Sequence, residues 1–155
     1  MRNIADEIRE RGHGYRNQVI ELTRCTASDS VAIALELQAF TDVFHSTLIH
    51  YENDQPLQYE ERFVSPRFAP DYLQQDFADT TPNVYLNRVA AMTEATHVVE
   101  AILPSPKVAE ALEMSESAPC LRITRRSWCR TGVVCLSHLI HPGDRFRLGG
   151  HVSSL

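Results

Sequence analysis

The sequence lacks an excess of positive charge, a long apolar run and any low-complexity tract. Fifteen Lys and Arg residues stand against twenty Asp and Glu residues, so the formal net charge is −5. Nucleic-acid affinity depends largely on neutralising phosphates, and we expect a chain of this sign not to bind DNA by itself. No stretch approaches the roughly 18 apolar residues of a membrane span, and the polar start MRNIADEIRERG has no signal-peptide core. We therefore expect a cytoplasmic protein without a membrane partner.

The sequence also lacks the short motifs that mark metal sites, redox sites and enzymes. No CxxC spacing joins its four cysteines, Cys25, Cys120, Cys129 and Cys135. This argues against a structural zinc site and predicts reduced thiols. His138 and His141 form an HxxH motif, but at strand spacing their side chains point to opposite faces. Because no nucleophile or cofactor signature is present either, we expect no metal, no cofactor and no enzymatic activity.

What is present is the composition of one ordinary globular domain. The 155 residues are 43% hydrophobic and 23% charged, values at which a chain can bury a core. Helices are expected to begin after Ser28 or Asp29, after Thr81 and after Ser105, and residues 71–77 (DYLQQDF) to form a short surface helix. Strand-forming runs lie at 15–26, 43–51, 57–64, 96–103, 120–129 and 133–141. Hairpins interrupted by helices predict an α+β domain with a largely antiparallel sheet.

Polar residues punctuate the predicted hairpin of strands 43–51 and 57–64. Alternation places Ser46 and His50 on the same face as Phe44 and Leu48, so neither face of this strand is purely apolar. We expect a sheet face that carries such polar groups to line a wet pocket.

Four short motifs, in this order along the chain, resemble the UTRA domain, the effector-binding domain of GntR-superfamily transcriptional regulators. In that family a turn ending in Pro precedes an acidic strand residue, an Ala-x-x-Leu helix precedes a Pro-led strand ending in Arg, and a Gly-Asp-Arg-aromatic motif closes the domain. The matching residues here are Pro56 with Glu60, Ala109 to Leu112, Pro119 with Arg125, and Gly143 to Phe146. The chain is similar to the histidine-utilisation (HutC) type of this family in the segments NIADEIRERGHGY and TPNVYLN, and in RRSW followed by HPGDRFRL.

The resemblance implies a chorismate-lyase-like fold, with a six-stranded, largely antiparallel sheet surrounded by helices. It implies a ligand-binding domain over residues 15–155, with residues 1–14 as a linker remnant or first segment. It further implies a homodimer, a small-molecule effector, expected to be urocanate, and operator binding through an N-terminal winged-helix domain that this chain lacks. The implied function is effector sensing and dimerisation in a repressor of histidine-utilisation genes.

Urocanate joins a carboxylate to an imidazole through a flat link, so its site needs a cationic or amide donor at one end and an acceptor at the other. His50 could donate to the carboxylate, on a strand where related sugar-phosphate sensors carry basic residues. The family's strand acid falls on Glu60, which shares a face with Arg62. We expect Glu60 to bind the imidazole and Arg62 the carboxylate. The alternative is an ion pair on an exposed face.

Other candidate ligand contacts lie at one helix start and on the last strand. Asn83 occupies the family's ligand-touching serine position at a helix N-terminus, which favours anions, although it could serve helix geometry alone. Tyr85 follows it and could equally be a core residue. Ser137 and His141 share a strand face, where His141 could stack on the ligand or cap the strand end instead.

Three other interpretations remain open. The domain could sense another metabolite, such as a sugar phosphate or a different carboxylate. It could be a lyase-like enzyme acting on an aromatic carboxylate, with Glu60, His50 and His141 as an acid-base set, or a dimerisation module without a ligand. The basic cluster of Arg122, Arg125 and Arg126 is split by alternation, and we interpret it as forming dimer or interdomain ion pairs.

Overall fold

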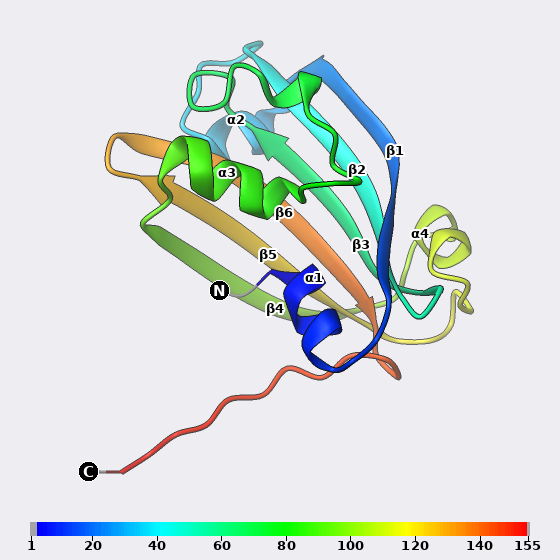
Figure 1. The fold of residues 1–155 in the computed structure, drawn as a ribbon. Coiled ribbons are helices and arrows are strands. Elements are labelled where there is room, and N and C mark those ends of the chain that lie inside the picture. The colour runs from blue at the N-terminus through cyan, green and yellow to red at the C-terminus, as the bar shows by residue number, and fades with distance from the viewer. Residues whose placement is uncertain (1–2, 155) are drawn as a thin grey trace.

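The computed structural model describes residues 3–154, which form one antiparallel sheet with helices on both faces (Figure 1). The strands are β1 (Tyr15–Thr26), β2 (Asp42–Glu52), β3 (Gln55–Val64), β4 (Glu94–Ile102), β5 (Cys120–Cys129) and β6 (Gly132–Pro142). Their order in the sheet is β1-β2-β3-β6-β5-β4, and every neighbouring pair is antiparallel. The predicted α+β class and the six-stranded antiparallel sheet are both confirmed.

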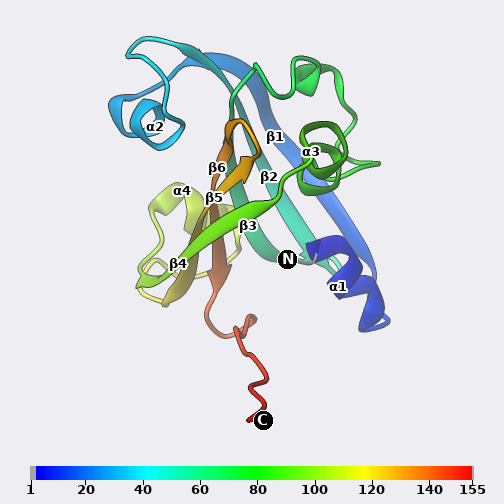
Figure 2. The same ribbon diagram turned by 90° about the vertical axis from the view of Figure 1, so that its left-hand side faces the viewer.

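The helices divide between the two faces of the sheet. They are α1 (Ile4–Glu10), α2 (Asp29–Ala34), α3 (Pro82–Ala90) and α4 (Pro106–Ala111), with a short 3-10 helix, η1, at Tyr72–Gln74. Figure 2 shows α1 and α3 on one side of the sheet and α2 and α4 on the other. Among residues 3–154, no helix is long and apolar enough to cross a membrane.

Side-chain caps define where three of the helices begin. Ser28, Thr81 and Ser105 each accept a hydrogen bond from the backbone N–H three residues on, at 3.3, 3.4 and 3.3 Å. Proline occupies the first turn of α3 and of α4, where its missing N–H has no intrahelical partner in any case. The predicted helix starts are therefore confirmed.

The β2–β3 hairpin turns through two residues with left-handed backbone. Asn53 and Asp54 have φ of 48° and 63°, which Asn and Asp tolerate better than most residues. The turn is thus shorter than the expected 52–56, and both strands extend further toward it. The resulting register places His50 opposite Gln58 and Leu48 opposite Glu60.

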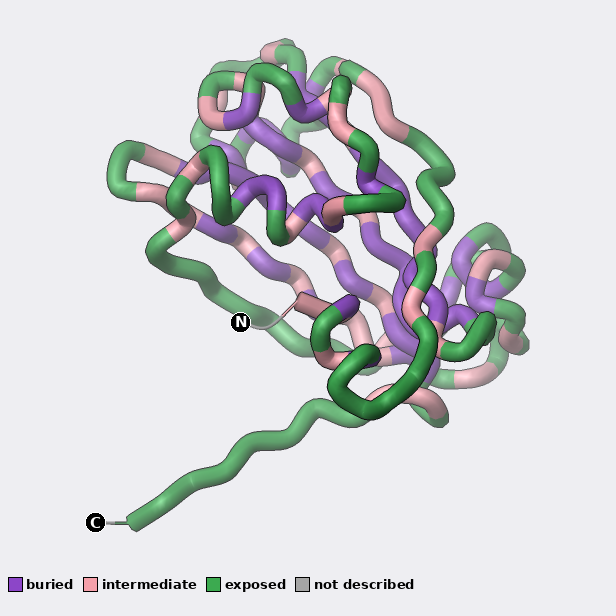
Figure 3. The backbone as a smooth tube through the Cα atoms, viewed as in Figure 1, coloured by how far each residue is buried: buried purple, intermediate pink, exposed green. Residues whose placement is uncertain are grey.

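Apolar clusters pack on both faces of the sheet. Figure 3 shows that the buried segments lie mainly in the central strands, whereas β4 is exposed. Phe44, Leu48 and Val64 pack under α3 with Tyr85 and Leu86. On the opposite face, Val43 packs with residues of α2, and Ile49 with residues of α4. The face under α1 and α3 therefore has an apolar end, and its other end carries the polar residues.

The segment predicted as a short surface helix is partly a core element. The helix is reduced to η1, and Tyr72 at its start is fully buried. Its hydroxyl pairs with the Ser46 hydroxyl at 2.8 Å, which satisfies two polar groups of the sheet face at once. The prediction missed this because Tyr72 and Phe77, five residues apart in a polar segment, fit neither the helical nor the strand period.

Candidate functional site

A cavity of about 380 Å³ lies between the polar end of the sheet face and the helices that cover it. Its lining comes from β2, β3, β5 and β6, from α1, from the start of α3 and from the chain after β6. Small-molecule sites span roughly 300–1,000 Å³, so the volume suits a small ligand. Five of the seven predicted contact residues line it: His50, Glu60, Arg62, Asn83 and His141.

A buried ion pair between Glu60 and Arg62 of β3 lies on the wall of the cavity that the sheet forms. Arg62 Nε donates to Glu60 Oε2 at 3.2 Å, and both residues are at most 3% exposed. Burial alone would raise the pKa of the Glu60 carboxyl, but Arg62 and His50 outweigh it and hold that pKa at about 2. Glu60 is therefore ionised, and the pair is not the exposed ion pair that the sequence left open.

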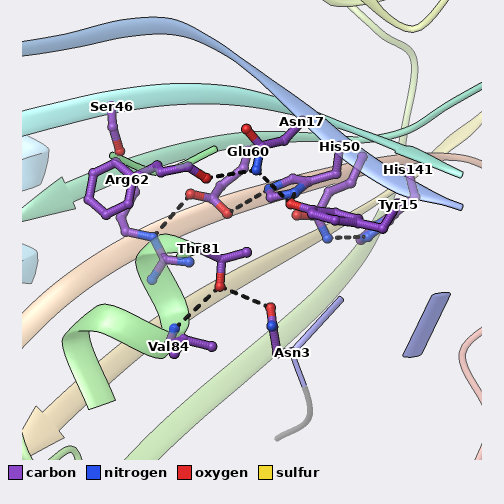
Figure 4. Close-up of polar contacts among 12 residues, drawn as sticks. Asn3, Tyr15, Asn17, Ser46, His50, Glu60, Arg62, Thr81, Val84 and His141 are labelled. Atoms are coloured by element: carbon purple, nitrogen blue, oxygen red, sulfur yellow. Dashed lines mark hydrogen bonds and ion pairs between the residues drawn. The ribbon is translucent and has the colours of Figure 1, made fainter. Parts of the chain in front are cut away.

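A chain of hydrogen bonds extends from this pair to the first strand (Figure 4). The Asn17 amide donates to the Tyr15 oxygen at 2.8 Å and to Phe77 O at 2.8 Å. The Tyr15 hydroxyl then donates to His50 Nδ1 at 2.8 Å, and His50 Nε2–H donates to Glu60 Oε1 at 3.0 Å. These hydrogen bonds orient the His50 ring and the Glu60 carboxylate.

A second buried imidazole lies at the end of β6. Burial lowers the pKa of His141 to about 4, so its ring is neutral at neutral pH. The Gln58 amide, 2.9 Å from His141 Nε2, donates to that nitrogen. The Phe146 ring stacks on the imidazole with a centroid distance of 3.7 Å and an interplanar angle of 11°. His141 thus joins β3 to the chain after β6.

Arg125 brings a second guanidinium to the cavity. It is 7% exposed, and its Nε donates to His97 Nε2 at 3.0 Å. Burial and the nearby Arg62 lower its pKa to about 10, which still leaves it charged at neutral pH. The interpretation of Arg125 as part of a dimer or interdomain ion pair stays a prediction, and within this domain the side chain lines the cavity.

Helices α1 and α3 meet over the cavity through their first residues. The Thr81 hydroxyl, which caps α3, donates to the Asn3 amide oxygen at 3.1 Å. Further along α1, Ala5 and Ile8 are buried, and Arg11 donates to Glu52 at 2.8 Å. The segment expected as a linker remnant or first segment therefore supplies one wall of the cavity.

Two of the predicted contact residues lie outside the cavity lining. Tyr85 points into the apolar cluster, where its ring is 6.1 Å from Phe77 and 6.2 Å from Tyr72. Ser137 is fully buried on β6, between Arg62 on β3 and Arg125 on β5. The structure thus places Tyr85 as the core residue that the sequence left open, and Ser137 at a buried strand position outside the cavity lining.

No group of three or more His, Cys, Asp or Glu side chains could hold a metal ion in the described part of the chain. His138 is paired with Thr124 at 3.3 Å, whereas His141 is bound to Gln58. The HxxH motif is therefore split between the two sheet faces, as its strand spacing indicated. The four cysteines are free thiols.

The sequence interpretation missed several lining residues. Gln58 could have been found, because alternation places it on the face of Glu60 and Arg62. Arg125 could have been found from the same rule once β5 was paired with β6. Asn3 gave no signal, and Phe146 stood out only as the aromatic of the closing motif, because both reach the cavity through the packing of the chain ends against the sheet.

The chain is similar to known proteins over almost all of its length. Residues 10–147 match the UTRA domain family. The chain is 49% identical over 154 residues to a histidine utilization repressor of Pseudomonas aeruginosa, and 41% identical over 154 residues to one of Klebsiella aerogenes. Each alignment covers 99% of this chain but only 62% and 64% of the relative, so the chain spans less than two thirds of their length.

Solved structures agree with this relationship. The C-terminal domain of a histidine utilization repressor from Pseudomonas syringae pv. tomato superposes with a TM-score of 0.88 at 43% identity, covering 91% of this chain and all of that one. PhnF from Mycobacterium smegmatis superposes with a TM-score of 0.88 at 14% identity, covering all of this chain and 70% of that one. At that identity the second likeness concerns the fold alone.

Proposed function

This chain belongs to the UTRA domain family, and from that premise we propose that it is the effector-sensing domain of a repressor of histidine-utilisation genes, with urocanate as the inducer. Three curated relatives that align with 99% of the chain carry the name histidine utilization repressor. Their names are those of regulators and not of enzymes. A repressor acts where the DNA is, so we place the protein in the cytoplasm.

The observation that carries the proposal is the chemistry of the cavity lining. Its buried part holds one ionised carboxylate, two imidazoles and two guanidinium groups, which belong to Glu60, His50, His141, Arg62 and Arg125. An anionic group of a ligand can bond the guanidinium groups, and a ring N–H can donate to the Glu60 carboxylate. Urocanate offers both on one flat skeleton.

We place the ligand's imidazole at Glu60 and its carboxylate at the guanidinium groups. Glu60 uses each oxygen once, for His50 and for Arg62, and a carboxylate oxygen can accept a second hydrogen bond. Arg62 Nε donates to Glu60 and Arg125 Nε donates to His97, and each guanidinium has further N–H donors. We therefore place the carboxylate at these two guanidinium groups, with Asn83 at the start of α3 as a further donor.

Two further elements of the proposal concern the whole repressor. The curated relatives are longer than this chain. We propose that the full-length repressor also has an operator-binding winged-helix domain and that it acts as a homodimer. Because α1 forms a wall of the cavity, a ligand that favours one position of α1 would also shift the position of the winged-helix domain that we propose to precede it.

The test is the melting temperature of this domain with urocanate, histidine or N-acetylglucosamine-6-phosphate. A ligand at about 100 times its Kd adds about 2.7 kcal/mol, which corresponds to roughly 5–10 °C for a domain of this size. We expect such a rise with urocanate and none with the other two. A rise with the sugar phosphate alone would replace urocanate by a phosphorylated effector, and no rise with any of them would refute the proposed effector.

A further inference from the structure

We propose that the chain segment 143–148, directly after β6, is a fixed wall of the ligand cavity, and that Phe146 within it contacts the ligand and selects a flat ring. The proposal rests on the proposed function in one respect, since it takes the cavity to be a small-molecule site. It adds a recognition element that lies outside the sheet and outside the helices.

The segment is held in place by one arginine. Arg145 Nη1 donates to Pro56 O at 2.6 Å and to Leu112 O at 3.1 Å, and its Nη2 donates to Glu113 O at 3.2 Å. The carbonyls at 112 and 113 follow α4, and carbonyls at a helix C-terminus lack intrahelical partners and favour a cation. One side chain thus ties the segment to the β2–β3 hairpin and to α4.

The path of the chain between β6 and this anchor is also constrained. The Gly143 N–H donates to Pro119 O at 2.9 Å, and a Cβ at Gly143 would lie 2.9 Å from the same oxygen. A side chain at this position would collide with backbone, so the close approach requires glycine. Gly143 and Arg145 together fix the position of the next residue, Phe146.

That place is against an imidazole inside the cavity. Phe146 and His141 are stacked at 3.7 Å, and both line the cavity. Among the described residues that line the cavity, Phe146 is the one with a benzene or indole ring; the rest of the lining is polar or aliphatic. A flat conjugated ligand gains from an aromatic wall through offset or edge contacts, which a puckered or saturated ligand makes less well.

The stack also fixes which part of the ligand Phe146 meets. His141 is held by Gln58 on its Nε2, so its ring cannot turn without breaking a buried hydrogen bond. Because Phe146 is parallel to that ring and both rings line the cavity, Phe146 borders the cavity beside a neutral imidazole. Phe146 therefore acts on the shape of the ligand, while the charged groups act on its ends.

The experiment compares Phe146→Leu with Phe146→Tyr, and uses Phe40→Leu as a matched control because Phe40 is 85% exposed. Kd is measured by calorimetry for urocanate and for imidazolepropionate, which has the same ends joined by a saturated link. We expect Phe146→Leu to raise the Kd of urocanate about three- to tenfold, with a smaller change for imidazolepropionate, and the other two variants to match the parent. Melting temperatures without ligand verify that each variant is folded.

Equal urocanate affinity in Phe146→Leu and the parent would overturn the inference and leave the proposed function standing. If the parent does not bind urocanate, the proposed effector is wrong, and benzoate at millimolar concentration then decides the inference. A benzoate-induced shift of the His141 ring signals by NMR that is lost in Phe146→Leu supports the aromatic wall. The same response in both proteins, including none, overturns it.

Discussion

Glu60 and Arg62, two residues apart on one face of β3, form an ion pair at 3.2 Å that is almost completely shielded from solvent. Replacing one partner of such a pair leaves the other charge buried without compensation, which typically costs about 3–5 kcal/mol. We therefore expect Glu60→Gln to lower the free energy of unfolding by about 3 kcal/mol in urea denaturation. Glu100→Gln is the control, because Glu100 is paired with Arg122 at the surface and exposed pairs contribute about 1 kcal/mol or less. Equal losses in the two variants would contradict the buried pair.

His141 predicts how stability depends on pH. Burial lowers its pKa from an ordinary value of 6.5 to about 4 in the folded state. As pH falls, the unfolded chain therefore binds this proton before the folded chain does. The free energy of unfolding is unaffected by this group above pH 6.5 and decreases as pH falls from 6.5 to 4. We expect His141→Asn to flatten that part of the stability-pH curve, by up to about 3 kcal/mol. His151→Asn, in the exposed chain end, should keep the parent's slope; a His141→Asn curve that also keeps it would exclude this residue as the source.

The Tyr15 hydroxyl predicts a coupling between β1 and the cavity. Tyr15→Phe removes the donor to His50 Nδ1 and the acceptor of the Asn17 amide. We expect a loss of about 1–2 kcal/mol in unfolding free energy and weaker urocanate binding, because His50 is no longer fixed toward Glu60. Tyr51→Phe removes a hydroxyl that bonds Gln18 instead, and its affinity for urocanate should equal that of the parent. Unchanged affinity in Tyr15→Phe would show that the chain of hydrogen bonds has no role in binding.

Thr81 predicts a difference between two helix caps. Thr81→Ala and Ser105→Ala each remove an N-cap, and each should cost about 1 kcal/mol in unfolding free energy. Only Thr81 also bonds Asn3 and lies in the cavity lining, so only Thr81→Ala is expected to weaken urocanate binding in calorimetry. Thr81→Ser should restore both the cap and the affinity. The prediction fails if the two alanine variants bind urocanate alike.

The sequence predicted those parts of the site that depend on local pattern. Period-two alternation placed Ser46 with His50 on one strand face and Glu60 with Arg62 on another, and the Thr81-Pro82 pair fixed the start of α3. It could not predict whether Glu60 and Arg62 face solvent or the interior, because that depends on which helices cover the face.

The parts that were missed come from segments distant in the sequence. Arg125 was interpreted, together with Arg122 and Arg126, as forming dimer or interdomain ion pairs, and the pairing of β5 with β6 places it beside Ser137. Asn3 and Phe146 lie near opposite ends of the chain and reach the same cavity only in the folded domain. Contacts of this kind leave no periodic signature in the sequence.

The order of the strands has a consequence for how the binding site forms during folding. β3 and β6 are neighbours in the sheet, with Tyr59 opposite Ile140, although about 80 residues separate them in the chain. Closing so long a loop is entropically expensive and slow, and the hairpins β2–β3 and β5–β6 can each form well before they meet. Glu60 and His141 are brought together only by that late step. Ligand affinity should therefore appear with the last phase of refolding, which makes binding a kinetic marker of the completed domain.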